Sequence, residues 1–153
     1  MSPRPYTTKQ MGDACEMLVA SELTLAGVPA MKMPDNWPGY DVIAQLKDVA
    51  APQRISVKSR TFKRGKDAYV EYNVKDNNFD WMAILLLPNG NEGPTKRQFF
   101  IFPKAISDVR FYRSGPKTKW HDIMSVQVDR IALVISEFED NFILSATGTV
   151  KPN

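Results

Sequence analysis

Residues 39–60 read GYDVIAQLKDVAAPQRISVKSR and predict a β-hairpin. Two short runs rich in apolar residues, 41–46 and 54–58, flank a polar connection that contains Pro52. Runs of this length between turn-forming residues are typical of β-strands. Asp41 begins the first run and Lys58 ends the second, so the hairpin brings a carboxylate and an amine onto neighbouring strands.

The composition is that of a globular protein. The chain has 153 residues, of which 43% are hydrophobic and 24% charged, and we expect one domain over residues 1–153 with a loose arm at 1–7. No apolar run is long enough to span a bilayer, and the first residues lack the apolar core of a signal peptide. A single cysteine excludes an internal disulfide and favours the cytoplasm. A net charge of +3 is compatible with a polyanionic partner.

The remaining chain predicts an α/β protein in which helices alternate with strands. The continuous apolar run 80–87 has the length and composition of a central strand that is buried on both faces. We expect helices over 8–26, 104–109 and 126–138, and further strands over 28–33, 68–74, 98–102 and 142–144.

Two glutamates lie in the first predicted helix. At about 100° per residue, Glu22 falls near the middle of the apolar arc and Glu16 at its margin. A residue at the margin can pack its stem while its carboxylate faces a neighbouring cleft. Helix geometry alone favours the alternative that both glutamates are ion-pair partners.

Several catalytic arrangements are missing from the sequence. One histidine, His121, and one cysteine, Cys15, cannot form a zinc cluster, and the chain has no GxxxxGK, GxGxxG or GxSxG motif. The remaining acids and Lys58 suit phosphodiester hydrolysis. A carboxylate at a strand start can hold Mg²⁺ with a backbone carbonyl of the neighbouring strand, and a lysine can orient water and stabilise the developing charge.

The motifs that contain these residues resemble those of a known protein superfamily. They are Gly12-x-x-x-Glu16 in the first helix, Tyr40-Asp41-Val42-Ile43 and Ser56-Val57-Lys58, followed more weakly by Asp80-Trp81, residues 99–103 and residues 137–142. In this order and spacing, the chain resembles the PD-(D/E)XK nuclease superfamily. Within it, the chain is similar to compact bacterial members such as intron-encoded homing endonucleases and Holliday-junction resolvases.

The resemblance implies a restriction-endonuclease-like core, with a mixed central sheet of about five strands flanked by helices. It implies that Asp41 binds Mg²⁺ or Mn²⁺, that Lys58 is the catalytic lysine, and that Glu16 is the acid of the first helix. Val57 would add its backbone carbonyl to the metal site. Asp35 follows a proline but lies in the loop before the strand, so we do not assign it to the site.

Ser56 departs from the family pattern, because an acid is expected two residues before the lysine. Three explanations stay open. Ser56 and the remaining acids hold the metal; or the acid has moved downstream, with Glu71 as the candidate; or the site is inactive and the fold only binds.

The sequence also predicts a surface for phosphates. Between residues 54 and 66 there are six basic residues and no acid. Such a run, next to the hairpin, favours contacts with a nucleic-acid backbone. The residues assigned to this surface are Arg54, Arg60, Lys63, Arg64 and Lys66. A second basic segment at 110–121 is either a backbone contact or a plain exposed loop.

We therefore expect a metal-dependent DNA endonuclease that acts as a monomer or a homodimer. The alternatives are a catalytically inactive module of the same fold that binds nucleic acid or protein, and an unrelated α/β domain.

Overall fold

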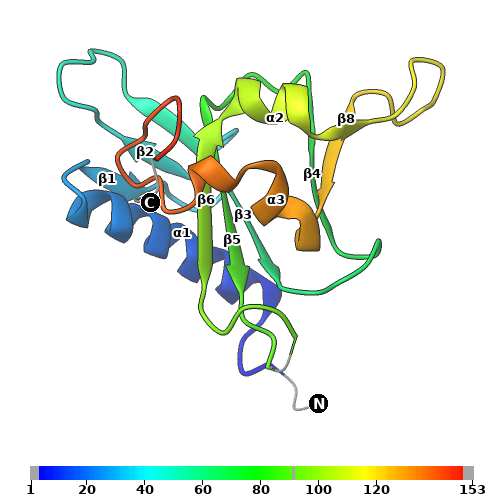
Figure 1. Ribbon diagram of the computed structural model, residues 1–153. Helices are drawn as coiled ribbons and strands as arrows, with labels where there is room; N and C mark the ends of the chain where they lie inside the picture. The colour runs from blue at the N-terminus through cyan, green and yellow to red at the C-terminus, as the bar shows by residue number, and fades with distance from the viewer. Residues whose placement is uncertain (1–3, 91, 150–153) are drawn as a thin grey trace.

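A mixed five-stranded sheet forms the centre of the computed structural model, which describes residues 4–90 and 92–149 (Figure 1). In the order β1-β2-β3-β5-β6, β3 pairs parallel with β5 and the other neighbours pair antiparallel. This arrangement confirms the predicted α/β class and the 39–60 hairpin, and it places the apolar strand β5 in the interior of the sheet, with its side chains buried on both faces. The strands are β1 (Ala30–Lys32), β2 (Val42–Ala44), β3 (Gln53–Thr61), β5 (Trp81–Leu87) and β6 (Gln98–Pro103).

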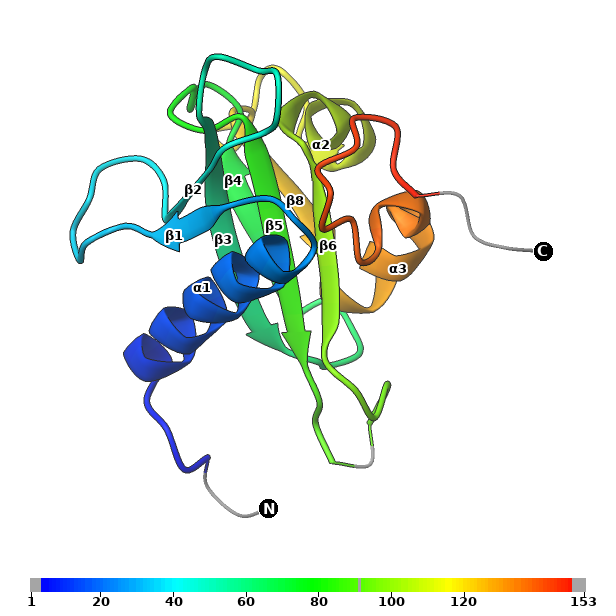
Figure 2. The ribbon, with the colours of Figure 1, turned by 90° about the vertical axis from the view of Figure 1, so that its left-hand side faces the viewer.

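Helix α1 (Thr8–Leu25) packs across one face of this sheet, in front of β3 and β5 in Figure 2. It begins with a capping box in which Thr7 and Gln10 each bond the backbone of the other. Buried apolar side chains of the helix, such as Cys15 and Val19, pack in one cluster with Ile55 of the sheet. Among the described residues, no helix is long and apolar enough to cross a membrane. Of the predicted arm, residues 1–3 lie outside the described part of the chain.

A second sheet, which was not expected from the sequence, covers the other face of the central sheet. Its order is β4-β8-β7, with antiparallel pairing throughout. The inner side chains of this sheet join Met82 and Ile84 of β5 in a second buried cluster. The elements on this side are β4 (Tyr69–Asn73), α2 (Lys104–Arg110), β7 (Tyr112–Arg113), β8 (Ile123–Gln127) and α3 (Ile131–Val134).

The predicted helix over 126–138 is wrong. Strand β8 continues to Gln127, and the following residues form 3₁₀ turns at Val128–Arg130 and Ser136–Phe138 on either side of the one-turn helix α3. The buried side chains Met124, Val126 and Val128 alternate along the chain, which is the strand period and not the helical one.

The predicted strand at 142–144 is also wrong, because these residues form a turn that Asn141 fastens to β6. Asn141 is fully buried, and its Nδ2 donates to the carbonyls of Ile101 and Ser145, both at 2.9 Å. Its Oδ1 accepts from the N–H of Ser145 at 3.0 Å. Leu144 has a φ of 53°, which a strand residue does not adopt. The segment after α3 therefore covers the outer edge of β6.

Candidate active site

The carboxylates of Glu16 and Asp41 meet at the point where the pairing of β2 with β3 ends. The Asp41 N–H donates to the Ile55 carbonyl at 2.9 Å, and Asp41 Oδ2 accepts from the Val57 N–H at 2.8 Å. The Glu16 carboxyl reaches this place from α1, lines the same pocket as Asp41 and lies within hydrogen-bonding reach of its carboxyl. Two of the predicted acids, far apart in sequence, are thus in contact.

The turn before Asp41 depends on glycine. Gly39 has a φ of +92°, and a Cβ built on it would lie 2.4 Å from the Cβ of Asn78. Both the backbone conformation and the close approach exclude a side chain at this position. Gly39 therefore lets the loop pass close to Asn78 and enter β2 with Asp41 at its start.

The environment raises the pKa of Glu16 from 4.5 to about 7. Partial burial is the main cause, followed by the hydrogen bond to Asp41 and by the negative charge of Asp41, while Lys32 acts in the opposite direction. Near neutral pH, Glu16 therefore exchanges its proton readily. A bound cation would take the place of that proton, because both relieve repulsion between the two carboxylates.

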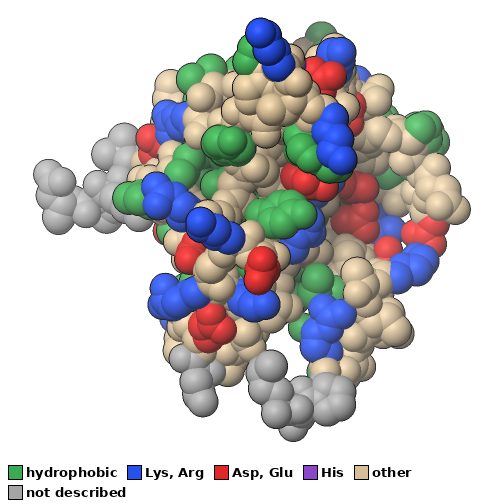
Figure 3. All heavy atoms as spheres, turned by 90° about the vertical axis from the view of Figure 1, so that its right-hand side faces the viewer, with side chains coloured by type: hydrophobic (Ala, Val, Ile, Leu, Met, Phe, Trp, Pro, Cys, Tyr) green, Lys and Arg blue, Asp and Glu red, His purple; other side chains and the backbone are tan. Residues whose placement is uncertain are grey.

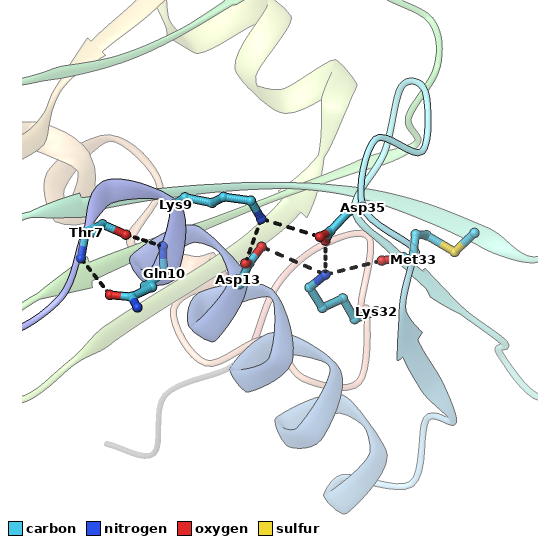
Figure 4. Close-up of polar contacts among 7 residues, drawn as sticks. All are labelled: Thr7, Lys9, Gln10, Asp13, Lys32, Met33 and Asp35. Atoms are coloured by element: carbon cyan, nitrogen blue, oxygen red, sulfur yellow. Dashed lines mark hydrogen bonds and ion pairs between the residues drawn. The ribbon is translucent and has the colours of Figure 1, made fainter.

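Four further charged side chains line the same pocket and were not assigned to it from sequence (Figure 4). Lys9 lies 3.0 Å from Asp13 and 3.4 Å from Asp35, and Lys32 lies 3.3 Å from Asp35. The two lysines neutralise Asp35, the acid that was not assigned to the site from the sequence. Helical spacing could have identified Lys9 and Asp13, because residues 9, 13 and 16 follow each other on one side of a helix.

The backbone of Lys58 lies beside the two carboxylates, but its side chain leaves β3 on the face of the sheet opposite α1. Ile55 and Val57 pack towards α1, so alternation directs Ser56 and Lys58 to the opposite face. There they lie next to Met82 and Ile84 of β5 in the parallel ladder. Ser56 is buried. Because Asp41 bonds the N–H of Val57, Lys58 is the next residue along the strand from this contact.

Glu71 does not lie near Glu16 and Asp41. Its neighbours Val70 and Tyr72 point into the core from β4, so Glu71 points outward and lines a different groove, formed on the second sheet. Of the three explanations for Ser56, the displaced acid thus receives no geometric support from Glu71.

The predicted phosphate surface divides into two groups. The guanidinium of Arg54 pairs with Asp80 at 3.0 Å, and that of Arg60 donates to the backbone carbonyl of Tyr69 at 3.1 Å. Both arginines thus connect parts of the fold. Lys63, Arg64 and Lys66 are exposed in the loop after β3, where they are accessible to a polyanion.

The donor set fits a hard divalent cation with a small number of protein ligands. The described residues contain no group of three His, Cys, Asp or Glu side chains arranged to hold a metal. Mg²⁺, however, is commonly bound by one or two carboxylates, with water and substrate phosphate completing its coordination. Glu16 and Asp41 provide two, and the carbonyl of Val57 faces the same strand edge as its N–H.

The chain is similar to several solved structures, among them a homing endonuclease and a Holliday junction resolvase. A bacterial homing endonuclease is 15% identical, with a TM-score of 0.47 over 74% of this chain and 84% of its own. A Holliday junction resolvase from Archaeoglobus fulgidus is also 15% identical, with a TM-score of 0.46 over 76% of this chain and 91% of its own. No protein-family model matches the chain, and no curated protein matches it.

The raised pKa of Glu16 gives a testable effect on stability. The folded protein holds the Glu16 proton more tightly than the unfolded chain does. Protonated Glu16 therefore stabilises the fold fully below about pH 4.5, and this stabilisation is lost as the pH rises through about 7. After discounting for solvent screening, we expect the unfolding free energy to fall by on the order of 1 kcal/mol from pH 5 to pH 8, and Glu16→Gln to remove this fall.

Urea unfolding at both pH values, with EDTA present, measures the effect. Glu22→Gln, on the same helix but outside the pocket, is the matched control and should behave like the unmodified protein. The same fall with pH in Glu16→Gln would contradict the assignment.

Proposed function

We propose that this chain is a metal-dependent endonuclease that hydrolyses phosphodiester bonds of DNA. The observation that supports the proposal best is the contact between Glu16 and Asp41 beside the backbone of Val57. Carboxylates held together at an accessible strand edge, next to a lysine, suit metal-assisted phosphoryl chemistry. The proposal covers residues 1–153 as a single PD-(D/E)XK nuclease-like domain that works in the cytoplasm.

Each residue has a proposed role. Asp41 and Glu16, with the carbonyl of Val57, would hold Mg²⁺ or Mn²⁺. The bound ion would neutralise the scissile phosphate and acidify a water molecule. Lys58 leaves β3 on the face opposite α1, so its long side chain would have to reach back to the strand edge to orient the attacking water and stabilise charge on the transition state. The buried hydroxyl of Ser56 would support this arrangement where the family has an acid.

The exposed Lys63, Arg64 and Lys66 would bind DNA phosphates, with Arg54 and Arg60 beside them.

The test is cleavage by the purified chain of supercoiled, linear and branched DNA, with Mg²⁺, with Mn²⁺ and with EDTA. We expect nicking or cutting of at least one substrate that depends on the metal. No cleavage of any substrate, or cleavage that persists in both Asp41→Ala and Lys58→Ala, would overturn the proposal. A nuclease of this size often needs two copies to cut both strands, so we also propose a homodimer, which sedimentation in the presence of DNA would detect.

A binding module on the same fold is the second candidate, and Ser56 is the observation that favours it. A serine hydroxyl is a neutral and weaker metal ligand than a carboxylate. This candidate predicts DNA or protein binding that does not depend on metal. Calorimetric titration with Mn²⁺ distinguishes the two, because tight binding that is lost in Asp41→Asn would contradict the inactive module.

A further inference from the structure

The outer face of the second sheet carries aromatic side chains that are not buried. Along β4 and β8, Val70 and Met124 point into the core, while Tyr69 and Ser125 alternate with them and point outward. Tyr112 of β7 lies directly opposite Ser125 in the antiparallel ladder and so shares its face. Tyr69 is 44% exposed and Tyr112 is 68% exposed.

These tyrosines line an open groove together with Trp120, which is 58% exposed. The groove has a volume of about 790 Å³. Figure 3 shows this side of the molecule, where hydrophobic side chains lie among basic and acidic ones on a hollowed surface. None of its lining residues belongs to the pocket of Glu16 and Asp41.

Positive charge surrounds the aromatic residues. Lys66, Arg110 and Arg130 line the groove, and the Lys119 ammonium lies 4.8 Å from the centre of the Trp120 ring. The segment 110–120 contains four basic residues and no acid. The basic residues here are not all equally available, because Arg110 is paired with Glu137 and Arg113 lies 3.5 Å from Asp122.

We propose that this face, defined by Tyr69, Tyr112 and Trp120, binds unpaired nucleotides of single-stranded nucleic acid. Exposed aromatic rings stack on bases of any sequence, while surrounding cations contact the phosphates. Bases in a duplex are already stacked on each other, so the rings select an unpaired strand. Glu71, an exposed residue that lines the groove, repels phosphates and can accept a hydrogen bond from an amino group of a base.

The inference goes beyond the proposed endonuclease, because binding at this face requires neither metal nor the Glu16–Asp41 pair. A protein partner would also be attracted by exposed tyrosine and tryptophan. Among the described residues that line the groove, Lys66, Arg110 and Arg130 outnumber the single acid, Glu71, and this balance favours a polyanion instead.

The experiment measures the fluorescence anisotropy of a labelled oligo-dT 20-mer, and of a duplex of equal length, with the full chain in EDTA. We expect single-stranded DNA to bind at least several-fold more tightly than the duplex. Tyr112→Ala combined with Trp120→Ala should lower single-strand affinity on the order of tenfold or more, since each lost base stack has a large effect. The affinity for the duplex should change by less than about threefold.

Three controls separate the explanations. Trp120→Phe, which keeps an aromatic ring, should retain most of the single-strand affinity, and circular dichroism should show that the double variant is folded. Trp37→Ala removes a tryptophan that is 45% exposed at the other pocket, and should bind like the unmodified chain. Asp41→Asn should bind single strands normally even though it cannot cut, so failure of the endonuclease proposal and failure of this inference give different results.

The inference is overturned if single-stranded DNA does not bind, if the duplex binds equally well, or if the folded double variant binds like the unmodified chain. Binding to phosphatidylserine vesicles or to a protein, without binding to the oligonucleotide, would also overturn it.

Discussion

Asp41→Asn is expected to abolish metal-dependent DNA cleavage, with a rate at least about 1,000-fold lower, or about 4 kcal/mol of lost transition-state stabilisation. The fold should be preserved, because the asparagine carbonyl can still accept the 2.8 Å hydrogen bond from the Val57 N–H. The charge that the metal requires is then lost while the local geometry remains. Single-turnover cleavage of the best DNA substrate, at saturating Mg²⁺, measures the effect.

Two acid-to-amide variants are matched controls for this change. Asp35→Asn alters an acid of the same pocket that Lys9 and Lys32 already neutralise, and should leave the cleavage rate within about threefold. Glu71→Gln alters the acid on the outer face of β4, and should have a similarly small effect. A rate for Glu71→Gln as low as that for Asp41→Asn would show that the displaced acid, and not Glu16, completes the site.

Asn141→Leu is expected to lower the unfolding free energy by about 3 kcal/mol. The substitution removes the polar side chain of the fully buried Asn141 and leaves the buried Ile101 carbonyl and the partly buried Ser145 N–H without their partner. Each buried polar group without a hydrogen bond costs about 1–3 kcal/mol. For a chain of this size the melting temperature should fall by about 10 °C, which thermal unfolding followed by circular dichroism would detect.

Ser145→Ala is the matched control for Asn141→Leu. The backbone of Ser145 bonds Asn141, whereas its hydroxyl contacts only the exposed Thr147. Removal of the hydroxyl should change the unfolding free energy by less than about 0.5 kcal/mol. Equal melting temperatures for Asn141→Leu and the unmodified chain would show that the turn does not hold the segment against β6.

The central sheet could be predicted because its signals are local. Within the predicted strand 80–87, residues 81–87 are apolar without interruption, and the two halves of the 39–60 hairpin are joined by a short polar connection. The contact of Glu16 with Asp41 followed only from the resemblance, since helix spacing could place Glu16 beside a cleft without showing which residue lies across it.

The second sheet could not be predicted because β4 pairs with a strand more than fifty residues later. Tyr69 is opposite Gln127, and nothing in the alternating pattern of either strand identifies the other. The predicted helix at 126–138 is wrong because its first apolar residues continue the alternation of strand β8. Only the later apolar residues lie in short helical turns. The direction of Lys58 depends on which face of β3 receives α1, and this is a property of tertiary packing.

The position of β4 has a consequence for the order of folding. In sequence, β4 lies inside the crossover that connects β3 to its parallel neighbour β5, yet its pairing with β8 closes a much longer loop. Loop-closure entropy grows with loop length, so the ladders of the central sheet are favoured to form before the second sheet. The edge of the central sheet that carries Asp41 would then already exist in a chain whose second sheet, with its exposed aromatic side chains, has not yet formed. Pulse-labelled hydrogen exchange during refolding should accordingly protect the amides of β5 before those of β4, and simultaneous protection would contradict this order.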